Sequence, residues 1–315
     1  MTFIKITGEN SAMPNTFEKA AFEKKLKRFD ILHSEASAVR EQDKILVRSL
    51  FENFSQKELT VGIGFQRAYG SVLSGDYFDL VKLPDDQFMF VFADVSGHGL
   101  PAYTTLIRLR SSITLAVKEA KKISATANRE LDTAALVNDI AVKFTDIMDE
   151  SNSTDFACII FAFISRIADQ YILKLYNRSM LFPIIIKPSQ GDIHIINLNY
   201  ASQGWEPKRG FYLGSDMHEL LGESYFNVPE CFYTIDKGDS VFFYSDGISE
   251  ACSLNDTEEF GDRRIEDVLM DYAGLFPQVV VDELFRNVYS FIGTPEAQTD
   301  DMTAVLIDFP SGGKK

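Results

Sequence analysis

The stretch FMFVFADVSGHGLP, residues 88–101, contains the pattern that decides the fold. Its first half is an apolar and aromatic run of strand length, which ends at Asp94. Gly99 and Pro101 follow, and Pro101 suits the first turn of a helix that continues through TTLIRLRSSITLAVKEAKK. The stretch therefore predicts a strand that ends in a carboxylate and leads directly into a long helix.

The segments next to this stretch indicate a hairpin before it and a further helix after it. The runs LTVGIGFQRAYG and YFDLVKL begin at Leu59, and Pro84-Asp85-Asp86 is typical of a tight turn before the strand that ends at Asp94. A second helix is expected over about residues 132–150. Two helices therefore follow the hairpin.

A second group of strands occupies the rest of the chain. It comprises DFACIIFAFISRI, YILKLYN, FPIIIKP and DIHIINL, and, after a polar loop near 200–228, CFYTI, VFFYSDG and MTAVLIDF. Helices are expected near 263–271 and 278–291, before the last strand. Because the connections between strands are short, antiparallel neighbours are favoured. This order predicts an α+β fold in which helices cover antiparallel sheets, and not a parallel doubly wound sheet.

The N-terminal region has a different character. Residues Asn15 to Glu18 have the form of a helix-capping box and open a charged stretch with few helix breakers. Apolar residues within it follow coiled-coil spacing at Leu32, Ala36, Val39, Leu46 and Leu50. The stretch is predicted to be a helical stalk that either packs on its own domain or pairs in a homodimer. We divide the chain into a flexible N-terminus (1–15), the stalk (16–58), one main domain (59–309) and a flexible tail (310–315).

Composition excludes several classes of protein. The chain has 31 Lys and Arg against 46 Asp and Glu, a net charge of −15, which argues against binding nucleic acid through phosphate neutralisation. Cys158, Cys231 and Cys252 are widely separated and odd in number, which favours a reducing cytoplasm over a disulfide framework. No run approaches the roughly 18 apolar residues of a membrane span, so we expect a soluble protein that has no membrane-spanning helix.

Carboxylates recur where predicted strands end. Asp76, Asp94, Asp246 and the pair Asp300 and Asp301 each lie at a strand end or in the adjoining turn, and most have glycine nearby. An ionised Asp beside an apolar strand costs free energy unless it is paired or binds a metal, and glycine lets backbone carbonyls approach the same ion. Any one motif is typical of an ordinary turn. The set together favours hard cations such as Mg²⁺ or Mn²⁺.

The order and flanking sequence of these motifs resemble the bacterial SpoIIE-type branch of the metal-dependent (PPM) protein phosphatases, over about residues 40–309. The matching stretches are SGDYFDL with ADVSGHGLPA, YSDGISEA followed by EFG, and QTDDMT. The resemblance implies a PPM-type α-β-β-α sandwich of two antiparallel sheets flanked by helices. It also implies hydrolysis of phosphoserine or phosphothreonine by a water that two Mn²⁺ or Mg²⁺ ions activate.

The resemblance also implies a set of ligands. Asp94 would bridge both ions and Asp76 would bind one of them. The carbonyl of Val95 would complete a shell, and Asp246 and Asp300 would hold the other side. All four aspartates are thus expected to be essential for catalysis.

Three further residues near these motifs have weaker assignments. Asp301 either binds metal or supports its neighbour Asp300. Arg67, on the strand before Asp76, is a candidate for contacting a substrate phosphate if it faces the site, or else a solvated strand residue. His98 does not match the Asp-Gly-His of eukaryotic members, so their general-acid role is not transferred to it, and we interpret it as a hydrogen-bonding residue at a helix start.

The resemblance implies a phosphorylated regulatory protein as partner, often a small anti-sigma-factor antagonist in relatives. Two departures from the family pattern leave alternatives open: Ser74 replaces a glycine before Gly75-Asp76, and Arg178 to Pro183 replaces an Ala-Gly-His-x-Pro turn. A catalytically weak sensor or scaffold is one alternative. A small-molecule phosphoesterase is another, although it needs a basic or aromatic leaving-group pocket that the sequence does not indicate. The stalk is placed to switch activity, since upstream segments do so in relatives.

Overall fold

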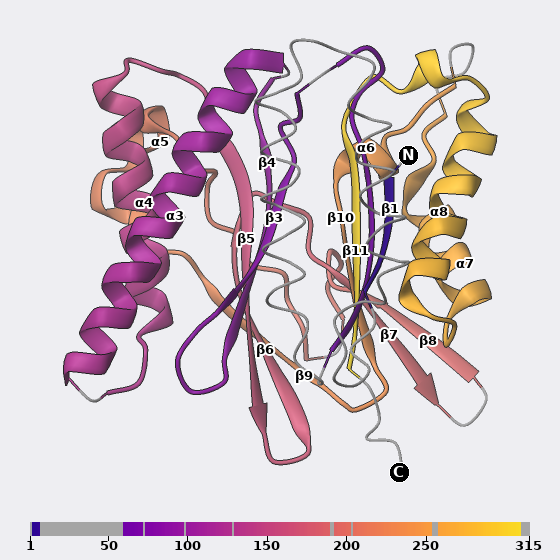
Figure 1. Cartoon of the computed structure of the whole chain (residues 1–315), viewed down its shortest axis with the longest axis horizontal. Coiled ribbons are helices and arrows are strands. Elements are labelled where there is room, and N and C mark those ends of the chain that lie inside the picture. The colour runs from indigo at the N-terminus through magenta and orange to yellow at the C-terminus, as the bar shows by residue number, and fades with distance from the viewer. Residues whose placement is uncertain are drawn as a thin grey trace, which may run out of the picture.

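Two antiparallel sheets pack face to face, and a pair of helices covers the outer face of each (Figure 1). The computed structural model describes residues 2–6, 59–71, 73–97, 99–127, 129–189, 192–202, 204–253 and 258–309. The expected stalk over 16–58, the tail over 310–315 and His98 lie outside these residues. The α-β-β-α sandwich predicted from the sequence is confirmed.

Sheet A has six strands in the order β1-β2-β11-β10-β7-β8, all antiparallel to their neighbours. Its strands are β1 (Thr2–Ile6), β2 (Thr60–Gln66), β7 (Ile184–Ser189), β8 (Asp192–Asn197), β10 (Ser240–Tyr244) and β11 (Met302–Asp308). Although residues 1–15 are expected to be flexible, Thr2–Ile6 form the edge strand of this sheet. The alternation TFIKI suits a strand, and five backbone positions pair with β2.

Sheet B has five strands in the order β3-β4-β5-β6-β9, again antiparallel. Its strands are β3 (Tyr77–Lys82), β4 (Phe88–Val95), β5 (Ala157–Ile167), β6 (Gln170–Arg178) and β9 (Glu230–Ile235). The expected turn between β3 and β4 is confirmed, with Asp85 and Asp86 at φ values of 58° and 53°. Two left-handed residues in succession give the backbone twist that closes a tight hairpin.

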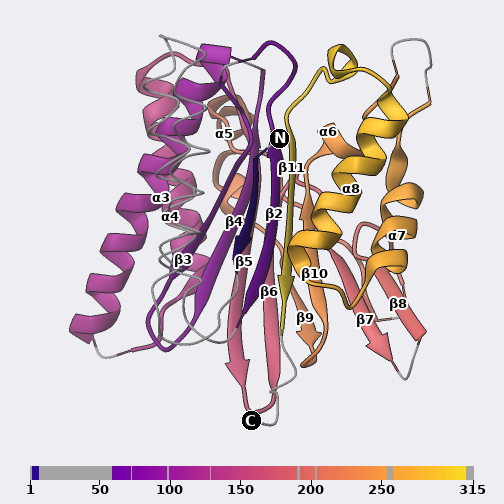
Figure 2. The same cartoon turned by 45° about the vertical axis from the view of Figure 1, so that its right-hand side comes forward.

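Helices α3 and α4 cover sheet B, whereas α7 and α8 cover sheet A (Figure 2). The helices are α3 (Gly99–Ala127), α4 (Thr133–Glu150), α5 (Ser215–Leu221), α6 (Asp246–Ser249), α7 (Gly261–Tyr272) and α8 (Pro277–Ile292), with 3₁₀ turns η1 (Gly222–Phe226) and η2 (Pro295–Ala297). The segment near 200–228, expected to be a polar loop, contains α5 and η1. Such short helices carry too few turns to leave a periodic signal. Among the described helices, none is long and apolar enough to cross a membrane.

The core has two parts, one on each face of sheet A. The larger part lies between the two sheets and extends under α3 and α4, and the rings of Phe90 and Phe243 meet across it at 4.6 Å. The smaller part lies between sheet A and the helices α7 and α8. Glycine permits this second contact to be close, because a Cβ atom on Gly62 would stand 2.3 Å from the carbonyl of Pro277.

Candidate active site

The five aspartates singled out in the sequence come together at one edge of the sandwich. They follow or precede strands of both sheets: Asp76 before β3, Asp94 in β4, Asp246 after β10, and Asp300 and Asp301 before β11. The first turn of α3 and the short helix α6 lie at this same end (Figure 1). The carboxylates are close enough for Asp94 to feel the charges of Asp246, Asp300 and Asp301, and for Asp76 to feel those of Asp94 and Asp301.

Asp94 occupies the penultimate position of β4, directly across from Cys158 on β5. Burial raises the pKa of its carboxyl group to about 8, with further contributions from the negative charges of Asp246 and Asp300. The backbone N–H of Val95 opposes this rise in the pKa of Asp94. A carboxylate in this position is stable in its charged form only when a cation compensates it.

Asp76 is almost fully buried, with 4% of its surface exposed. Burial raises the pKa of its carboxyl group well above the usual value, and the charges of Asp94 and Asp301 add to the effect. The hydroxyl groups of Thr303 and Ser245 oppose the shift, and Thr303 Oγ1 donates a hydrogen bond directly to Asp76 Oδ2. These two hydroxyls orient a carboxylate that otherwise faces like charges.

The departure at Ser74 fits the turn without disturbing it. Ser74 is buried, and its hydroxyl oxygen accepts a hydrogen bond of 3.0 Å from the backbone N–H of Asp76. A glycine would leave that N–H without this partner. The serine therefore stabilises the backbone at Asp76.

Asp301 joins two segments that are remote in sequence. Its Oδ1 accepts from the backbone N–H of Ala68 at 2.9 Å, and its Oδ2 accepts from the backbone N–H of Gly75 at 2.8 Å. Its own backbone N–H is in turn 2.7 Å from Asp300 Oδ1. With both oxygens engaged by the β2–β3 connection, the carboxylate of Asp301 acts as a tie between β11 and that connection.

Glycine is required at two points where backbones meet inside the site. A Cβ atom on Gly75 would stand 2.7 Å from the carbonyl oxygen of Val95 and 3.4 Å from Asp94 Oδ1. A Cβ atom on Gly247 would stand 2.0 Å from the carbonyl oxygen of Asp301. Any larger residue would therefore displace the carbonyl of Val95 or the loop before β11.

The chemistry of this set suits a hard divalent cation, although the side chains do not close around one. Among the described residues, Asp76 and Asp94 have no Lys or Arg partner, and the donors are oxygens only. In the same residues, no three His, Cys, Asp or Glu side chains converge closely enough to enclose an ion as they stand. The residue types, their burial and the mutual repulsion of their charges fit such a cation.

Arg67 is the remaining residue singled out in the sequence. It follows β2 directly, and its guanidinium group lies over the ring of Phe65, 5.6 Å from the ring centroid. Its carbonyl oxygen accepts a hydrogen bond of 2.7 Å from the side chain of Gln298. The backbone at Arg67 is thus tied to the loop that carries Asp300.

Sequence reasoning missed the polar side chains that support the aspartates. Thr303 and Ser245 lie within the motifs QTDDMT and YSDG, so their place beside the aspartates could have been predicted from the sequence. The hydrogen bonds that they make could not. Gln298 was also missed. The side-chain amide of Gln298 donates to the backbone carbonyl oxygens of Gln66 and Arg67. The backbone carbonyl oxygen of Gln298 accepts from Tyr69 N–H at 2.8 Å.

The altered turn after β6 is also well ordered by its own side chains. Asn177 Nδ2 donates to the carbonyl oxygen of Met180, and Asn177 Oδ1 accepts from Met180 N–H, each at 2.9 Å. Met180 is buried in the larger core. The loss of the family's Ala-Gly-His-x-Pro turn is therefore compensated locally.

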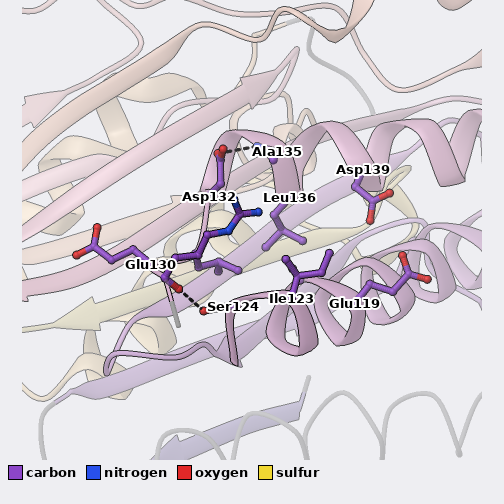
Figure 3. Close-up of a pocket in the computed structure, with 11 residues that line it drawn as sticks. Glu119, Ile123, Ser124, Glu130, Asp132, Ala135, Leu136 and Asp139 are labelled. Atoms are coloured by element: carbon purple, nitrogen blue, oxygen red, sulfur yellow. Dashed lines mark hydrogen bonds between the residues drawn. The ribbon is translucent and has the colours of Figure 1, made fainter. Parts of the chain in front are cut away.

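A separate pocket lies between the end of α3 and the start of α4 (Figure 3). Its lining includes four carboxylates, Glu119, Glu130, Asp132 and Asp139, against one arginine, Arg129, with Ile123 and Leu136 as apolar wall. More than 20 residues of helix separate it from Asp94, a rise of about 30 Å along α3. The pocket shares no residue with the aspartate site, and its acidic rim is unsuited to a phosphate group.

Comparison with known proteins agrees with this architecture. The family model for Stage II sporulation protein E (SpoIIE) matches residues 84–310. The SiaA-PP2C domain of Pseudomonas aeruginosa superposes with a TM-score of 0.60 and 16% identity, covering 94% of this chain and 100% of that one. The RsbU and RsbW domains of Rv1364c from Mycobacterium tuberculosis give 0.57 and 16%, covering 81% of this chain and 61% of that one.

Two further relatives extend the comparison. The PP2C phosphatase domain and regulatory fragment of SpoIIE from Bacillus subtilis give a TM-score of 0.55 at 16% identity, covering 81% of this chain and 63% of that one. Protein IcfG of Synechocystis sp. is 26% identical over 247 residues, which are 75% of this chain and 36% of IcfG. The chain thus spans about a third of the length of that curated relative.

The two-sheet sandwich flanked by helix pairs is the PPM-type fold, which this chain shares with the SiaA-PP2C domain and the phosphatase domain of SpoIIE. Within this fold, the chain belongs to the SpoIIE family, whose model covers most of it.

Proposed function

We propose that this chain hydrolyses phosphoserine or phosphothreonine on a regulatory protein, and that its five clustered aspartates form the catalytic centre. The observation that carries the proposal is the convergence of these aspartates from the strand ends of both sheets, close enough for their charges to add to the effect of burial on the pKa of Asp94. Four segments converge to create this unfavourable cluster of charge. Such a cluster is retained in a fold when cation binding compensates it.

The proposed ligands leave out Asp301, because each of its two oxygens accepts a hydrogen bond from a backbone N–H. Asp76, Asp94, Asp246 and Asp300, with the carbonyl of Val95, would hold two Mn²⁺ or Mg²⁺ ions. When bound, such ions supply an activated water for attack on phosphorus and neutralise charge on the phosphate.

The remaining polar groups position this set. Asp301 differs from the other aspartates because two backbone N–H groups already occupy its oxygens. It therefore holds Gly75 and the following Asp76 in place. Thr303 and Ser245 keep Asp76 oriented when the site changes occupancy. The protein itself supplies no nucleophile in this scheme.

The alternatives are less well supported. A catalytically silent scaffold has no need for all of the aspartates, and both departures from the family pattern are stabilised by their own hydrogen bonds. A small-molecule phosphoesterase needs a leaving-group pocket beside the aspartates, whereas the pocket of Figure 3 is remote and acidic. Comparing turnover of a phosphoprotein with that of small phosphate esters separates the enzyme classes.

The substrate class and location are part of the same proposal. A phosphorylated anti-sigma-factor antagonist or a similar signalling protein is the partner we favour, on the basis of SpoIIE family membership. The three cysteines are free thiols, which suits a reducing cytoplasm. A homodimer formed through residues 16–58 remains a prediction from the sequence, as does a phosphate contact by Arg67.

The decisive experiment measures phosphate release from phosphorylated casein with Mn²⁺, with Mg²⁺ and with EDTA. We expect metal-dependent turnover, and a loss of at least about 100-fold in Asp94→Asn and Asp246→Asn, because each removes a proposed ligand. Asp169→Asn is the matched control, since this exposed carboxylate pairs with Lys237 away from the site. Turnover that survives EDTA or either ligand variant would contradict the proposal.

A further inference from the structure

Arg178, the last residue of β6, is a buried cation that the proposed chemistry does not use. None of its surface is exposed, and burial lowers the pKa of its guanidinium group to about 10. Within the described chain, no carboxylate pairs with it. An unpaired buried charge is costly, so it is expected where it fixes a structure that the protein needs.

The guanidinium group binds the connection between β8 and β9, residues 198–229. Its NH1 donates to the carbonyl oxygen of Phe211 at 3.3 Å and its NH2 donates to that of Tyr225 at 3.0 Å. Its carbon also lies 4.6 Å from the centroid of the Tyr225 ring. Arg178 thus clamps two points of this connection, one on each side of α5.

The clamped part of the connection pairs with the ends of β5 and β6, two interior strands of sheet B. Leu213 and Ala157 exchange two backbone hydrogen bonds of 2.8 Å, and Gly210 N–H donates to the carbonyl oxygen of Asn177 at 2.7 Å. The hydroxyl of Tyr225 accepts from Gly214 N–H at 3.0 Å. The backbone on both sides of Tyr212 is therefore fixed.

The side chain of Tyr212 is held as firmly as its backbone. Its ring lies against that of Phe156, with centroids 4.4 Å apart, and its hydroxyl donates to Asp216 Oδ2 at 2.9 Å. An aromatic ring fixed by contact with a second ring and by a hydrogen bond presents a surface at little cost in conformational entropy.

Phe156 connects this ring to the aspartate site. Its N–H donates to Ser96 Oγ and its carbonyl oxygen accepts from Ser96 N–H, each at 2.9 Å. Ser96 comes two residues after Asp94. Since neighbouring strands lie about 4.8 Å apart, the backbone of Tyr212 is about 10 Å from that of β4. A phosphorylated side chain that reaches the aspartates therefore places its flanking polypeptide near Tyr212.

We propose that Tyr212 is a substrate-positioning residue, against whose ring the polypeptide flanking the phosphorylated residue packs, and that Arg178 positions it. This inference rests on the proposed function. It assigns the buried charge of Arg178 to substrate recognition. It gives neither Arg178 nor Tyr212 a role in metal binding.

The test compares the ratio of two specificity constants, kcat/KM for phosphorylated casein and kcat/KM for p-nitrophenyl phosphate. We expect Tyr212→Ala to lower this ratio at least tenfold through KM for casein, with kcat changed by less than about threefold. Tyr212→Phe should restore most of the ratio, because the ring contact with Phe156 remains. Phe232→Ala, which removes an exposed aromatic side chain on β9, is the matched control.

Arg178→Lys tests the clamp, because one ammonium group cannot bind both carbonyl oxygens in the fork geometry of a guanidinium. We expect the same fall in the ratio, with faster proteolytic cleavage within residues 198–229. If Arg178→Lys fails to fold, Tyr212→Ala still decides the matter, since Tyr212 is only half-buried.

The outcomes separate this inference from the proposed function. Wild-type protein without metal-dependent turnover of either substrate would overturn the proposed function. An active wild type whose ratio is unchanged in Tyr212→Ala would overturn the role of Tyr212 alone. A lowered ratio in Phe232→Ala of the same size would also overturn it, because any lost aromatic surface would then suffice.

Discussion

The carboxylate of Asp301 accepts a hydrogen bond of 2.8 Å from the backbone N–H of Gly75, across 226 positions of sequence. Its other oxygen accepts from Ala68 N–H, so one side chain fixes the entire β2–β3 connection against β11. That connection carries Asp76 at its end. Asp301 therefore holds Asp76 in position relative to Asp300, on the other side of the aspartate cluster, through hydrogen bonds to both of its oxygens.

Asp301→Asn should weaken metal binding without unfolding the protein. An amide has one acceptor oxygen, and its NH₂ group would face a backbone N–H donor, so one of the two bonds is lost. We expect Mn²⁺ affinity to fall by about 10- to 100-fold, the usual range for a residue that orients ligands. Titration calorimetry measures the affinity. An affinity equal to that of the Asp169→Asn control would contradict the assigned role.

Gly75→Ala should damage the site sterically. A Cβ atom there would stand 2.7 Å from the carbonyl oxygen of Val95, which must then move. We expect a loss of about 1–3 kcal/mol in the free energy of unfolding and weaker Mn²⁺ binding.

Gly62→Ala is the control for this substitution, because it makes a similar clash with Pro277 far from the aspartates. Both variants should be destabilised in urea unfolding, whereas only Gly75→Ala should bind Mn²⁺ less tightly. Equal Mn²⁺ affinity in the two variants would contradict the role of Gly75.

Thr303→Val should affect Asp76 through a single hydrogen bond. Valine keeps the shape of threonine and removes the hydroxyl that donates to Asp76 Oδ2. Loss of a donor to a buried carboxylate costs about 1–3 kcal/mol. We expect lower stability and lower Mn²⁺ affinity, with both restored in Thr303→Ser. Identical unfolding curves for wild type and Thr303→Val would rule out this contribution.

The stability of the protein should depend on pH through Asp308, at the far end of β11. Burial raises the pKa of its carboxyl group to about 6, against the hydrogen bond from Ser240. The folded state therefore binds a proton more tightly than the unfolded state, so stability falls as pH rises from about 4 to about 6. The shift corresponds to at most about 3 kcal/mol.

Asp308→Asn should remove this dependence and make the protein more stable than wild type at pH 7. An amide oxygen still accepts from Ser240, while no charge is buried. Urea unfolding at pH 4, 5, 6 and 7, in the absence of metal, measures both effects. The prediction would be contradicted if the stability of Asp308→Asn fell between pH 4 and pH 6 as steeply as that of wild type, or if the variant were less stable than wild type at pH 7.

Several parts of the structure could be predicted because their signals are local. The strand that ends at Asp94 is an apolar run bounded by glycine, and the turn at Asp85 and Asp86 lies between two such runs. The four Asp motifs were readable as a set because each follows or precedes a strand. The helical part of the β8–β9 connection was missed, since α5 is too short for a periodic pattern and is stabilised by packing.

By itself, the sequence determined the alternation of strands and helices, the α+β class and the aspartates at strand ends, because these depend on periodicity and on neighbouring residues. Only the tertiary structure decided which hydrogen bonds the carboxylate oxygens of these aspartates accept. The tie from Asp301 to Gly75, the hydroxyl of Thr303 on Asp76 and the clamp of Arg178 on Phe211 and Tyr225 all join positions far apart in sequence. Hydrogen-bond partners of this kind exist only once the sheets have packed, and no local pattern encodes them.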